Sequence, residues 1–257
     1  MSQIADRTPM SPARSRASYG IDAPGAVLAF IAIGSLLALA AAIGFGWPWT
    51  IPVPVAVSIA ALPLALFYLV WAAQMLWSSL VGKKHLRDHL VAALELKGSE
   101  RVLDAGCGRR LALIACAKQL TTGKAIGIDL WAAKDQSGNN PDATRANALA
   151  EGVADRVEVQ TGDITSLPFA DASFDAVISM TVIHNISGRA ARDKAIAELM
   201  RVLKPGGRIV LFDLLHTARY EKLLRQGGLG VRLLRTDFLW GFRGRSLLAQ
   251  KPKPANS

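Results

Sequence analysis

The stretch that decides the fold is Val102-Leu103-Asp104-Ala105-Gly106-Cys107-Gly108-Arg109-Arg110. Its apolar beginning predicts the end of a short buried strand, and the residues after it have a helical pattern. Glycines at a strand-to-helix turn let a ligand approach the backbone, and the first turn of the helix favours a negatively charged group. A dinucleotide-binding turn would carry a third glycine where Leu111 stands. The sequence therefore predicts a ligand site at this turn and disfavours a nicotinamide cofactor.

Short apolar runs and helical patterns alternate along the chain around this turn. Strands are expected at residues 101–104, 125–130, 156–161, 174–180, 208–215, 231–236 and 246–250. Helices are expected at residues 83–96, 109–120, 141–150, 190–203 and 217–226. This alternation is typical of an α/β fold, in which a mostly parallel sheet has helices on both faces. Residues 83–257 are expected to form one such domain.

Further motifs follow the first turn in a fixed order. They are Gly127-Ile128-Asp129-Leu130, Gly162-Asp163-Ile164, Phe174-Asp175-Ala176-Val177 and Leu203-Lys204-Pro205-Gly206-Gly207. Together with Asp104, Gly106 and Gly108, they resemble the class I S-adenosylmethionine-dependent methyltransferases, in particular the branch that contains quinone-biosynthesis C-methyltransferases. The resemblance covers roughly residues 95–250, so the N-terminal part of the chain lies outside it.

The resemblance implies a Rossmann-like, seven-stranded, mostly parallel sheet and S-adenosylmethionine as the cofactor. Gly106 and Gly108 would pass close to the methionine part of the cofactor, and Asp104 would bind near its amino group. Asp129 would accept hydrogen bonds from the ribose hydroxyls, and Asp163 would accept one from the adenine amine. The full set of expected cofactor-binding residues is Asp104, Gly106, Cys107, Gly108, Asp129, Leu130, Asp163, Ile164 and Met180.

One residue departs from the pattern of this family. Arg110 stands where the third glycine of the first motif is usual. Its guanidinium group could pair with the carboxylate of the cofactor, since arginine binds carboxylates through two parallel hydrogen bonds. Alternatively, its bulk could weaken cofactor binding. The sequence leaves both interpretations open.

Two histidines follow the expected fourth and fifth strands, which are neighbours in this fold. His184 and His216 are therefore candidates for the catalytic base, because a histidine with a pKa of about 6.5 can accept a proton at neutral pH. The alternative for each is a structural role at the end of a strand or against a helix. The sequence has no H-x-x-H motif and no cluster of carboxylates, so no metal site is expected.

Charged residues make up only 19% of the chain, because residues 23–82 contain no Asp, Glu, Lys, Arg or His. Two apolar runs in this segment, 26–46 and 55–81, are each long enough to cross a bilayer as a helix. Tryptophan and proline residues between them suit a turn at the membrane surface. We expect a transmembrane helical hairpin at residues 23–82, after a disordered tail at residues 1–22. A cleaved signal peptide and a buried core hairpin are the alternatives.

The charges that flank the apolar segment predict its orientation. Three arginines precede it, and Lys83, Lys84 and Arg87 follow it, whereas the connecting loop is uncharged. Because positive residues stay on the cytoplasmic side, both termini and the α/β domain are expected in the cytoplasm, at the inner membrane. The net charge of +10 is spread along the chain, which fits an anionic membrane surface better than nucleic acid.

The leading interpretation is a membrane-anchored S-adenosylmethionine-dependent methyltransferase. Its acceptor is an unidentified small molecule, and a lipid-like compound is one candidate because the anchor would hold the domain at the bilayer. The alternative is a non-catalytic module that binds an adenosyl ligand or serves assembly in the membrane. The sequence does not predict the oligomeric state.

Overall fold

The computed structural model describes residues 21–46, 52–108, 111–131 and 141–253. Most of the expected disordered tail, the tryptophans of the connecting loop and the polar stretch 134–140 lie outside these residues. Arg110 also lies outside them, so both interpretations of this residue stay open.

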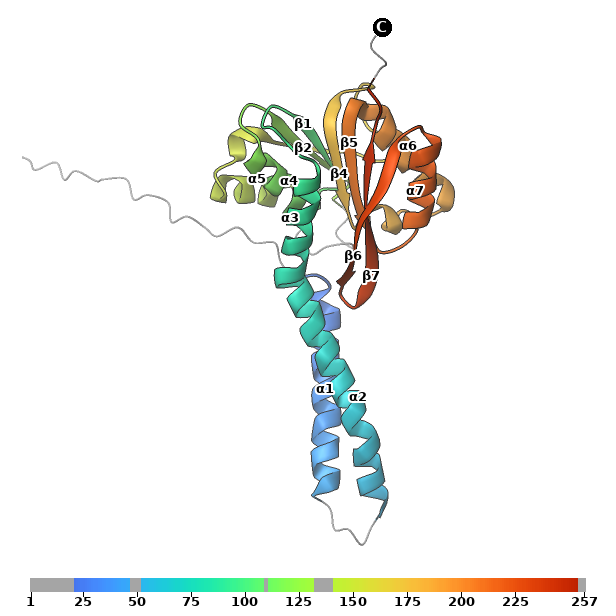
Figure 1. The fold of residues 1–257 in the computed structure, drawn as a ribbon. Helices are drawn as coiled ribbons and strands as arrows, with labels where there is room; N and C mark the ends of the chain where they lie inside the picture. Colours follow the sequence, from blue (N-terminus) through green and yellow to red (C-terminus); the bar gives the residue numbers. More distant parts are fainter. Residues whose placement is uncertain (1–20, 47–51, 109–110, 132–140, 254–257) are drawn as a thin grey trace, which may run out of the picture.

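The α/β domain is built on one seven-stranded sheet (Figure 1). In chain order the strands are β1 Arg101–Ala105, β2 Lys124–Asp129, β3 Val157–Thr161, β4 Phe174–Met180, β5 Leu203–Asp213, β6 Gly230–Leu239 and β7 Phe242–Gln250. Their order across the sheet is β3-β2-β1-β4-β5-β7-β6. The first five strands run parallel, while β7 is antiparallel to both β5 and β6. The predicted seven-stranded, mostly parallel sheet is confirmed.

Helices cover both faces of this sheet. They are α3 Lys83–Ala93, α4 Leu111–Gln119, α5 Pro141–Ala150, α6 Arg189–Val202 and α7 Thr217–Gln226. Leu90 of α3 and Leu113 of α4 belong to a core on one face, whereas Leu199 of α6 and Leu224 of α7 belong to a second core on the other face. The buried apolar side chains of α3 and α6 recur at helical spacing, so each of these helices packs one stripe against its neighbours, whereas α4 is buried at every position from 111 to 117. The predicted two-sided arrangement is confirmed.

Two long apolar helices extend from the domain (Figure 1). Helix α1 spans Pro24–Phe45, and α2 spans Pro52–Trp77 with Pro63 inside it. The two pack side by side, and Gly34 permits this approach because a Cβ atom there would lie 2.8 Å from the Leu69 side chain. Both are long and apolar enough to cross a membrane, and their most apolar windows are only 17% and 22% buried. So little burial is not typical of a core hairpin.

The second apolar helix continues into the domain without a break. A π-helical segment, Ser78–Gly82, joins α2 to α3, and all three have helical geometry. The expected boundary between the apolar segment and the domain, at residues 82 and 83, therefore falls inside one continuous helix. Because the helix is continuous, it fixes the orientation of the α/β domain relative to α2. A flexible linker would not fix this orientation.

The β6–β7 hairpin is longer than the expected strands at 231–236 and 246–250. Its turn is formed by Trp240 (φ 52°) and Gly241 (φ 85°), a left-handed pair that suits a tight hairpin but lacks the usual Asn-Gly signature. The turn packs on the long helix: the Trp71 and Phe242 rings lie 6.2 Å apart. The Trp240 backbone N–H also donates to Ser78 Oγ at 3.0 Å. This packing partner, distant in sequence, explains why the hairpin extends further than predicted.

Candidate active site

The candidate site lies where the order of the strands reverses, at the carboxyl ends of β1 and β4. Such a reversal leaves a crevice, because the crossover connections leave in opposite directions. A cavity of about 800 Å³ occupies this crevice. It is lined by every expected cofactor-binding residue, namely Asp104, Gly106, Cys107, Gly108, Asp129, Leu130, Asp163, Ile164 and Met180. The three carboxylates at or just beyond the carboxyl ends of β1, β2 and β3 thus line one cavity.

The turn after β1 requires glycine at its first position. Gly106 has φ 77°, and a Cβ atom there would lie 2.3 Å from Val182 Cγ1. The backbone N–H groups of Gly106 and Cys107 both donate to the Ile128 carbonyl oxygen. A side chain at position 106 would therefore push Val182 away and distort the turn, which explains the glycine in physical terms.

Asp129 is fixed at the end of β2 by two backbone hydrogen bonds. Its Oδ2 accepts from the Gly108 N–H at 2.9 Å, and its Oδ1 accepts from the Trp131 N–H at 2.7 Å. These bonds tie the end of β2 to the glycine turn and hold the carboxylate at the cavity wall.

Asp104 is the most unusual group in the cavity wall. It is only 2% exposed, and within the described residues its Oδ2 has no hydrogen-bond partner. Burial, followed by the nearby charge of Asp129, raises the pKa of Asp104 to about 7. A buried acceptor without a partner is costly unless a ligand completes it. A cationic amino group is the natural complement.

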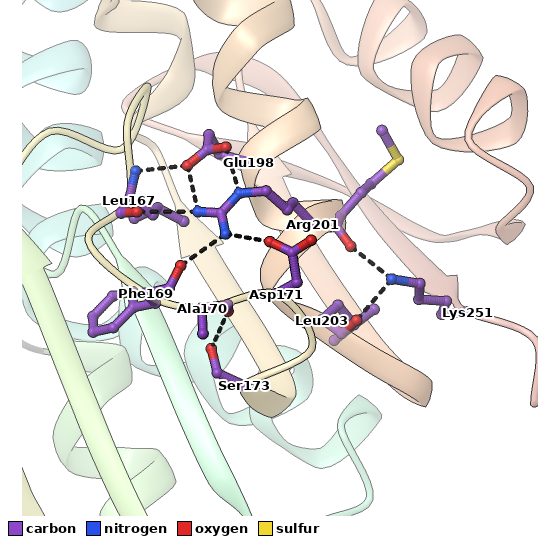
Figure 2. A network of polar contacts seen from close by, with 10 residues as sticks. Leu167, Phe169, Ala170, Asp171, Ser173, Glu198, Arg201, Leu203 and Lys251 are labelled. Atoms are coloured by element: carbon purple, nitrogen blue, oxygen red, sulfur yellow. Dashed lines mark hydrogen bonds and ion pairs between the residues drawn. The ribbon is translucent and has the colours of Figure 1, made fainter.

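The segment after β3 carries the third carboxylate and is held by an arginine. Asp163 accepts from the Thr165 N–H at 2.8 Å, and Ile164 beside it is 6% exposed. Figure 2 shows how the following residues are bound to α6 through Arg201. Arg201 donates to the carbonyl oxygens of Leu167 and Phe169, at 3.0 and 2.7 Å.

Two carboxylates complete this network around Arg201 (Figure 2). Arg201 pairs with Glu198 and Asp171, each at 2.7 Å. Glu198 in turn accepts from the Leu167 N–H at 2.7 Å, and the hydrogen bond from Arg201 lowers the pKa of Glu198. The guanidinium group thus fixes the course of the segment that positions Asp163 and Ile164.

We expect Arg201→Ala to loosen this segment. The change removes four hydrogen-bonding partners at once, so we expect a loss of about 2 kcal/mol in the free energy of unfolding and weaker binding of S-adenosylhomocysteine. Arg201→Lys should retain only part of the stability and of the binding, because an ammonium group cannot bind both carbonyl groups and both carboxylates. Thermal unfolding and titration calorimetry measure both effects. Arg145→Ala, at an exposed ion pair of α5, is the control, and identical results for the two alanine variants would contradict the role.

One of the two candidate histidines lies in the cavity wall. His184 belongs to a 3-10 turn, Ile183–Asn185, directly after β4. Its Nδ1 contacts Asp213 Oδ1, and its backbone N–H donates to Asp213 Oδ2 at 2.9 Å. Asp213 ends β5 and is 2% exposed, so the buried carboxylate holds both the backbone and the ring of His184.

The other candidate histidine lies outside this cavity wall. His216 is exposed and precedes α7 with a left-handed backbone, φ 62°. The structure thus groups His184 with the expected cofactor-binding residues and does not group His216 with them. The catalytic roles of both histidines stay predictions. Asp213 was missed by the sequence reasoning, although an acidic residue at the end of a buried strand was a usable signal.

A second set of cavity residues comes from outside the motifs. It consists of Asp22, Ala23, Met75, Lys83, Trp240 and Phe242. They lie at the start of α1, near the end of α2, at the start of α3 and in the β6–β7 turn. Nothing in their local sequence indicated a ligand site. In the described part of the chain no group of three or more His, Cys, Asp or Glu could hold a metal ion.

The comparisons with known proteins concern the domain that carries this cavity. Residues 103–211 match the family model described as a methyltransferase domain. This chain carries an S-adenosylmethionine-dependent methyltransferase domain. The methyltransferase domain includes β1 to β5, and with them Asp104, Asp129, Asp163 and His184. The residues from α1, α2 and the β6–β7 turn lie outside the match.

Curated relatives match about half of this chain. A sterol 4-C-methyltransferase of Caenorhabditis elegans is 32% identical over 142 residues, which is 54% of this chain and 38% of the relative. A demethylmenaquinone methyltransferase of Lactiplantibacillus plantarum is 34% identical over 136 residues, 52% of this chain and 54% of the relative. This chain therefore spans about half or less of the length of these two relatives.

Solved structures share the fold of the methyltransferase domain. The YcgJ protein of Bacillus subtilis superposes with a TM-score of 0.56 at 18% identity, covering 66% of this chain and 99% of that structure. A geranyl diphosphate methyltransferase, solved with S-adenosylmethionine, gives a TM-score of 0.51 at 16% identity, covering 66% of this chain and 85% of that structure. Each of these two structures therefore covers about two thirds of this chain.

The cofactor of such domains, S-adenosylmethionine, fits the residues at the carboxyl ends of β1 to β3. Oδ2 of Asp104, which has no partner among the residues that the structure describes, complements a cationic amino group, and the turn at Gly106 has no room for a side chain. Asp129 is held at the cavity wall by the backbone N–H groups of Gly108 and Trp131. The individual contacts of these residues with the cofactor stay predictions.

Proposed function

We propose that this chain is a membrane-anchored methyltransferase that transfers the methyl group of S-adenosylmethionine to a lipophilic acceptor. One observation carries the proposal: a single cavity is lined both by the cofactor motifs and by residues at the end of the apolar helices. The printed names of the relatives include a sterol and a demethylmenaquinone methyltransferase, and both names denote lipophilic acceptors. These names support the acceptor class for this chain.

The three carboxylates divide the binding of the cofactor between them. Asp104 would bind the amino group, Asp129 the ribose hydroxyls and Asp163 the adenine amine, with Ile164 packed on the ring. Bound S-adenosylmethionine supplies an electrophilic methyl group on a sulfonium sulfur. The described residues contribute alignment and exclusion of water, which such a displacement needs more than it needs a metal.

His184 is the proposed catalytic base. With Nδ1 directed at the buried Asp213 carboxylate, the proton of a neutral imidazole resides on Nδ1. The lone pair of Nε2 is then the ring position that can accept a proton from the acceptor as the new bond to the methyl group forms. Asp213 is a positioning residue, because it fixes the tautomer and the orientation of the ring.

The apolar helices are the proposed membrane anchor. Helix α1 and the helix through α2 meet the length and composition of bilayer spans and expose large apolar side chains along their length. Lys84 and Arg87 follow on the exposed or half-buried surface of α3, beside the first polar turn. Positive residues at this place support a cytoplasmic methyltransferase domain at the inner membrane, with both termini on the same side.

The proposal is tested with the full chain purified in detergent. The protein is incubated with S-adenosylmethionine carrying a tritiated methyl group and with a lipid extract of the source membranes. We expect tritium in the organic phase, in a species that mass analysis finds one methyl group heavier than its precursor. A labelled product only in the aqueous phase would contradict a lipophilic acceptor. Failure to bind the labelled cofactor would favour the non-catalytic alternative.

A further inference from the structure

The cavity continues beyond the methyltransferase domain toward the apolar helices. Besides the motif residues, its wall contains Met75 of α2, Lys83 of α3 and the turn residues Trp240 and Phe242. Asp22 and Ala23, directly before α1, complete this part of the wall. We call these six residues the membrane-side wall. None of them belongs to the matched family region, so this wall is a property of this chain.

Polar contacts fix the membrane-side wall to the π-helical segment. Ser79 Oγ accepts from the Asp22 N–H at 3.1 Å, and Ser78 Oγ accepts from the Trp240 N–H at 3.0 Å. The two serines are almost fully buried. A π-helical turn is uncommon and often marks a functional site. Here it directs consecutive serines to two segments that are far apart in the sequence, the start of α1 and the β6–β7 turn.

The position of this wall along the helix places it at the edge of the apolar region. Met75 lies in α2, and the chain before Lys83 has no charged residue back to Ala23. The Phe242 ring packs on Trp71, one turn before Met75, and Phe242 remains 57% exposed. Figure 1 shows α2 and α3 as one continuous helix, and Met75 and Lys83, which line the cavity, lie where the apolar stretch of this helix ends.

The charges of the wall limit what can bind there. The Lys83 ammonium group is buried and contacts both carboxylate oxygens of Asp22, at 3.2 and 3.1 Å. Asp22 and Lys83 are the charged residues of the membrane-side wall, and the carboxylates of Asp104, Asp129 and Asp163 line the cofactor part of the same cavity. An anionic head group at the membrane-side wall would meet the Asp22 carboxylate and a Lys83 cation that is already paired with it, so its burial would be costly. An uncharged head group has no such penalty.

We infer that the membrane-side wall is an acceptor subsite that takes an amphiphile with an uncharged, hydroxyl-bearing head group from the bilayer. The head group lies toward His184, and the apolar chain leaves between Met75 and Phe242 into the membrane. This inference rests on the proposed function. It adds the chemical class of the acceptor, and it places the path of the acceptor from the membrane at residues outside the matched family region.

The test uses the full chain in phosphatidylcholine vesicles and a photoreactive probe. The probe is a long-chain alkylphenol with a diazirine in its chain, and its sulfate ester serves as the anionic counterpart. After irradiation, labelled peptides are identified by mass spectrometry. We expect label from the phenol at the end of α2 and at the β6–β7 turn, and about tenfold less label there from the sulfate.

Two phenylalanine variants on the β6–β7 hairpin distinguish binding at this subsite from general contact of the hairpin with lipid. Phe242 lines the cavity, whereas Phe238 is 61% exposed and does not line it. We expect Phe242→Ala to reduce labelling of the α2 end about tenfold and Phe238→Ala to leave it unchanged. Met75→Trp, which fills the opening, should act like Phe242→Ala. Titration with S-adenosylhomocysteine checks that each variant is folded.

The outcomes distinguish this inference from the proposed function. Label confined to the outer surfaces of α1 and α2, or equal in the two phenylalanine variants, would overturn the subsite. Equal labelling by the phenol and its sulfate would overturn the uncharged head group. If the unchanged chain binds no S-adenosylhomocysteine, the proposed function fails, and the pattern of label still decides the subsite.

Discussion

His184→Ala lowers the turnover number by about 10² to 10⁴, the usual contribution of a general base, while cofactor binding stays unchanged. The reason is geometric. His184 lines the cavity, and its Nδ1 is held by a carboxylate that is itself buried, so the ring is fixed with Nε2 as its proton acceptor. Replacing the ring removes the acceptor and leaves Asp104, Asp129 and Asp163 in place. Steady-state rates with any identified acceptor, and calorimetric titration with S-adenosylhomocysteine, measure the two quantities separately.

A second variant distinguishes catalysis from simple support of the fold. Asp213→Asn keeps the size of the side chain but can present an N–H to Nδ1, which favours the opposite tautomer of His184. We expect a lower turnover number with little change in the Michaelis constant. The ¹⁵N chemical shifts of the imidazole report the tautomer directly, and a merely structural Asp213 would not change them.

Two further substitutions define the outcome that contradicts this role. His89→Ala, on the exposed face of α3, is the matched control for removal of an imidazole. His216→Ala compares the two predicted candidates. If His184→Ala retained full activity, or if His216→Ala lost as much as His184→Ala, the assignment of the base to His184 would be wrong.

Asp104→Asn has opposite effects on stability and on binding. The pKa of Asp104 rises from 3.8 to about 7 in the folded chain, mainly because burial disfavours the charged carboxylate. A folded-state pKa above the unfolded value means that the folded chain holds its proton more tightly. The contribution of Asp104 to the free energy of unfolding is therefore fully present below about pH 4, falls as the pH rises from 4 to 7, and is lost above about pH 7.

The size of this effect follows from the same two values. The difference between 3.8 and about 7 corresponds to at most about 4 kcal/mol. We expect Asp104→Asn to stabilise the ligand-free chain at pH 8 by up to this amount and to remove this part of the pH dependence. Thermal unfolding between pH 5 and pH 8, in detergent, measures both. Asp155→Asn, at an exposed carboxylate, is the control.

Cofactor binding changes in the other direction. The ionised Asp104 would pair with the amino group of the cofactor, and a hydrogen bond between charged groups contributes about 1.5–3 kcal/mol. We expect Asp104→Asn to weaken binding of S-adenosylmethionine about 10- to 100-fold. The unchanged chain should bind more tightly at pH 8 than at pH 6, because its carboxylate is then ionised before binding. Equal affinities for both chains at pH 8 would remove Asp104 from the cofactor site.

These opposed effects explain why a buried carboxylate whose Oδ2 has no hydrogen-bond partner among the described residues can persist in a stable domain. An apolar or amide side chain at position 104 would suit the ligand-free fold better, since an unpaired buried charge is costly. The carboxylate is stabilised only when a cation completes it. Strain of this kind is concentrated at ligand sites, because there it is relieved by the bound ligand.

Local sequence determined the architecture of the methyltransferase domain. Each strand–helix unit has its own apolar pattern, and parallel strands must place their carboxyl ends on one edge of the sheet. The acidic residues that follow β1, β2 and β3 were therefore certain to meet once the fold was known, as Asp104, Asp129 and Asp163 do. The absence of charge from residues 23–82 likewise determined that two long apolar helices form.

Only the tertiary structure decided which side chains outside the motifs complete the cavity. Asp213 reaches His184, and Asp22 reaches Lys83, across separations of 29 and 61 residues that no local pattern encodes. The length of the β6–β7 hairpin and the continuity of α2 with α3 depend on packing at Trp71 and on the buried serines of the π-helical turn. The physical reason is that periodicity and turn chemistry act over a few residues, whereas the identity of a contact across the molecule is fixed only when the segments have packed together.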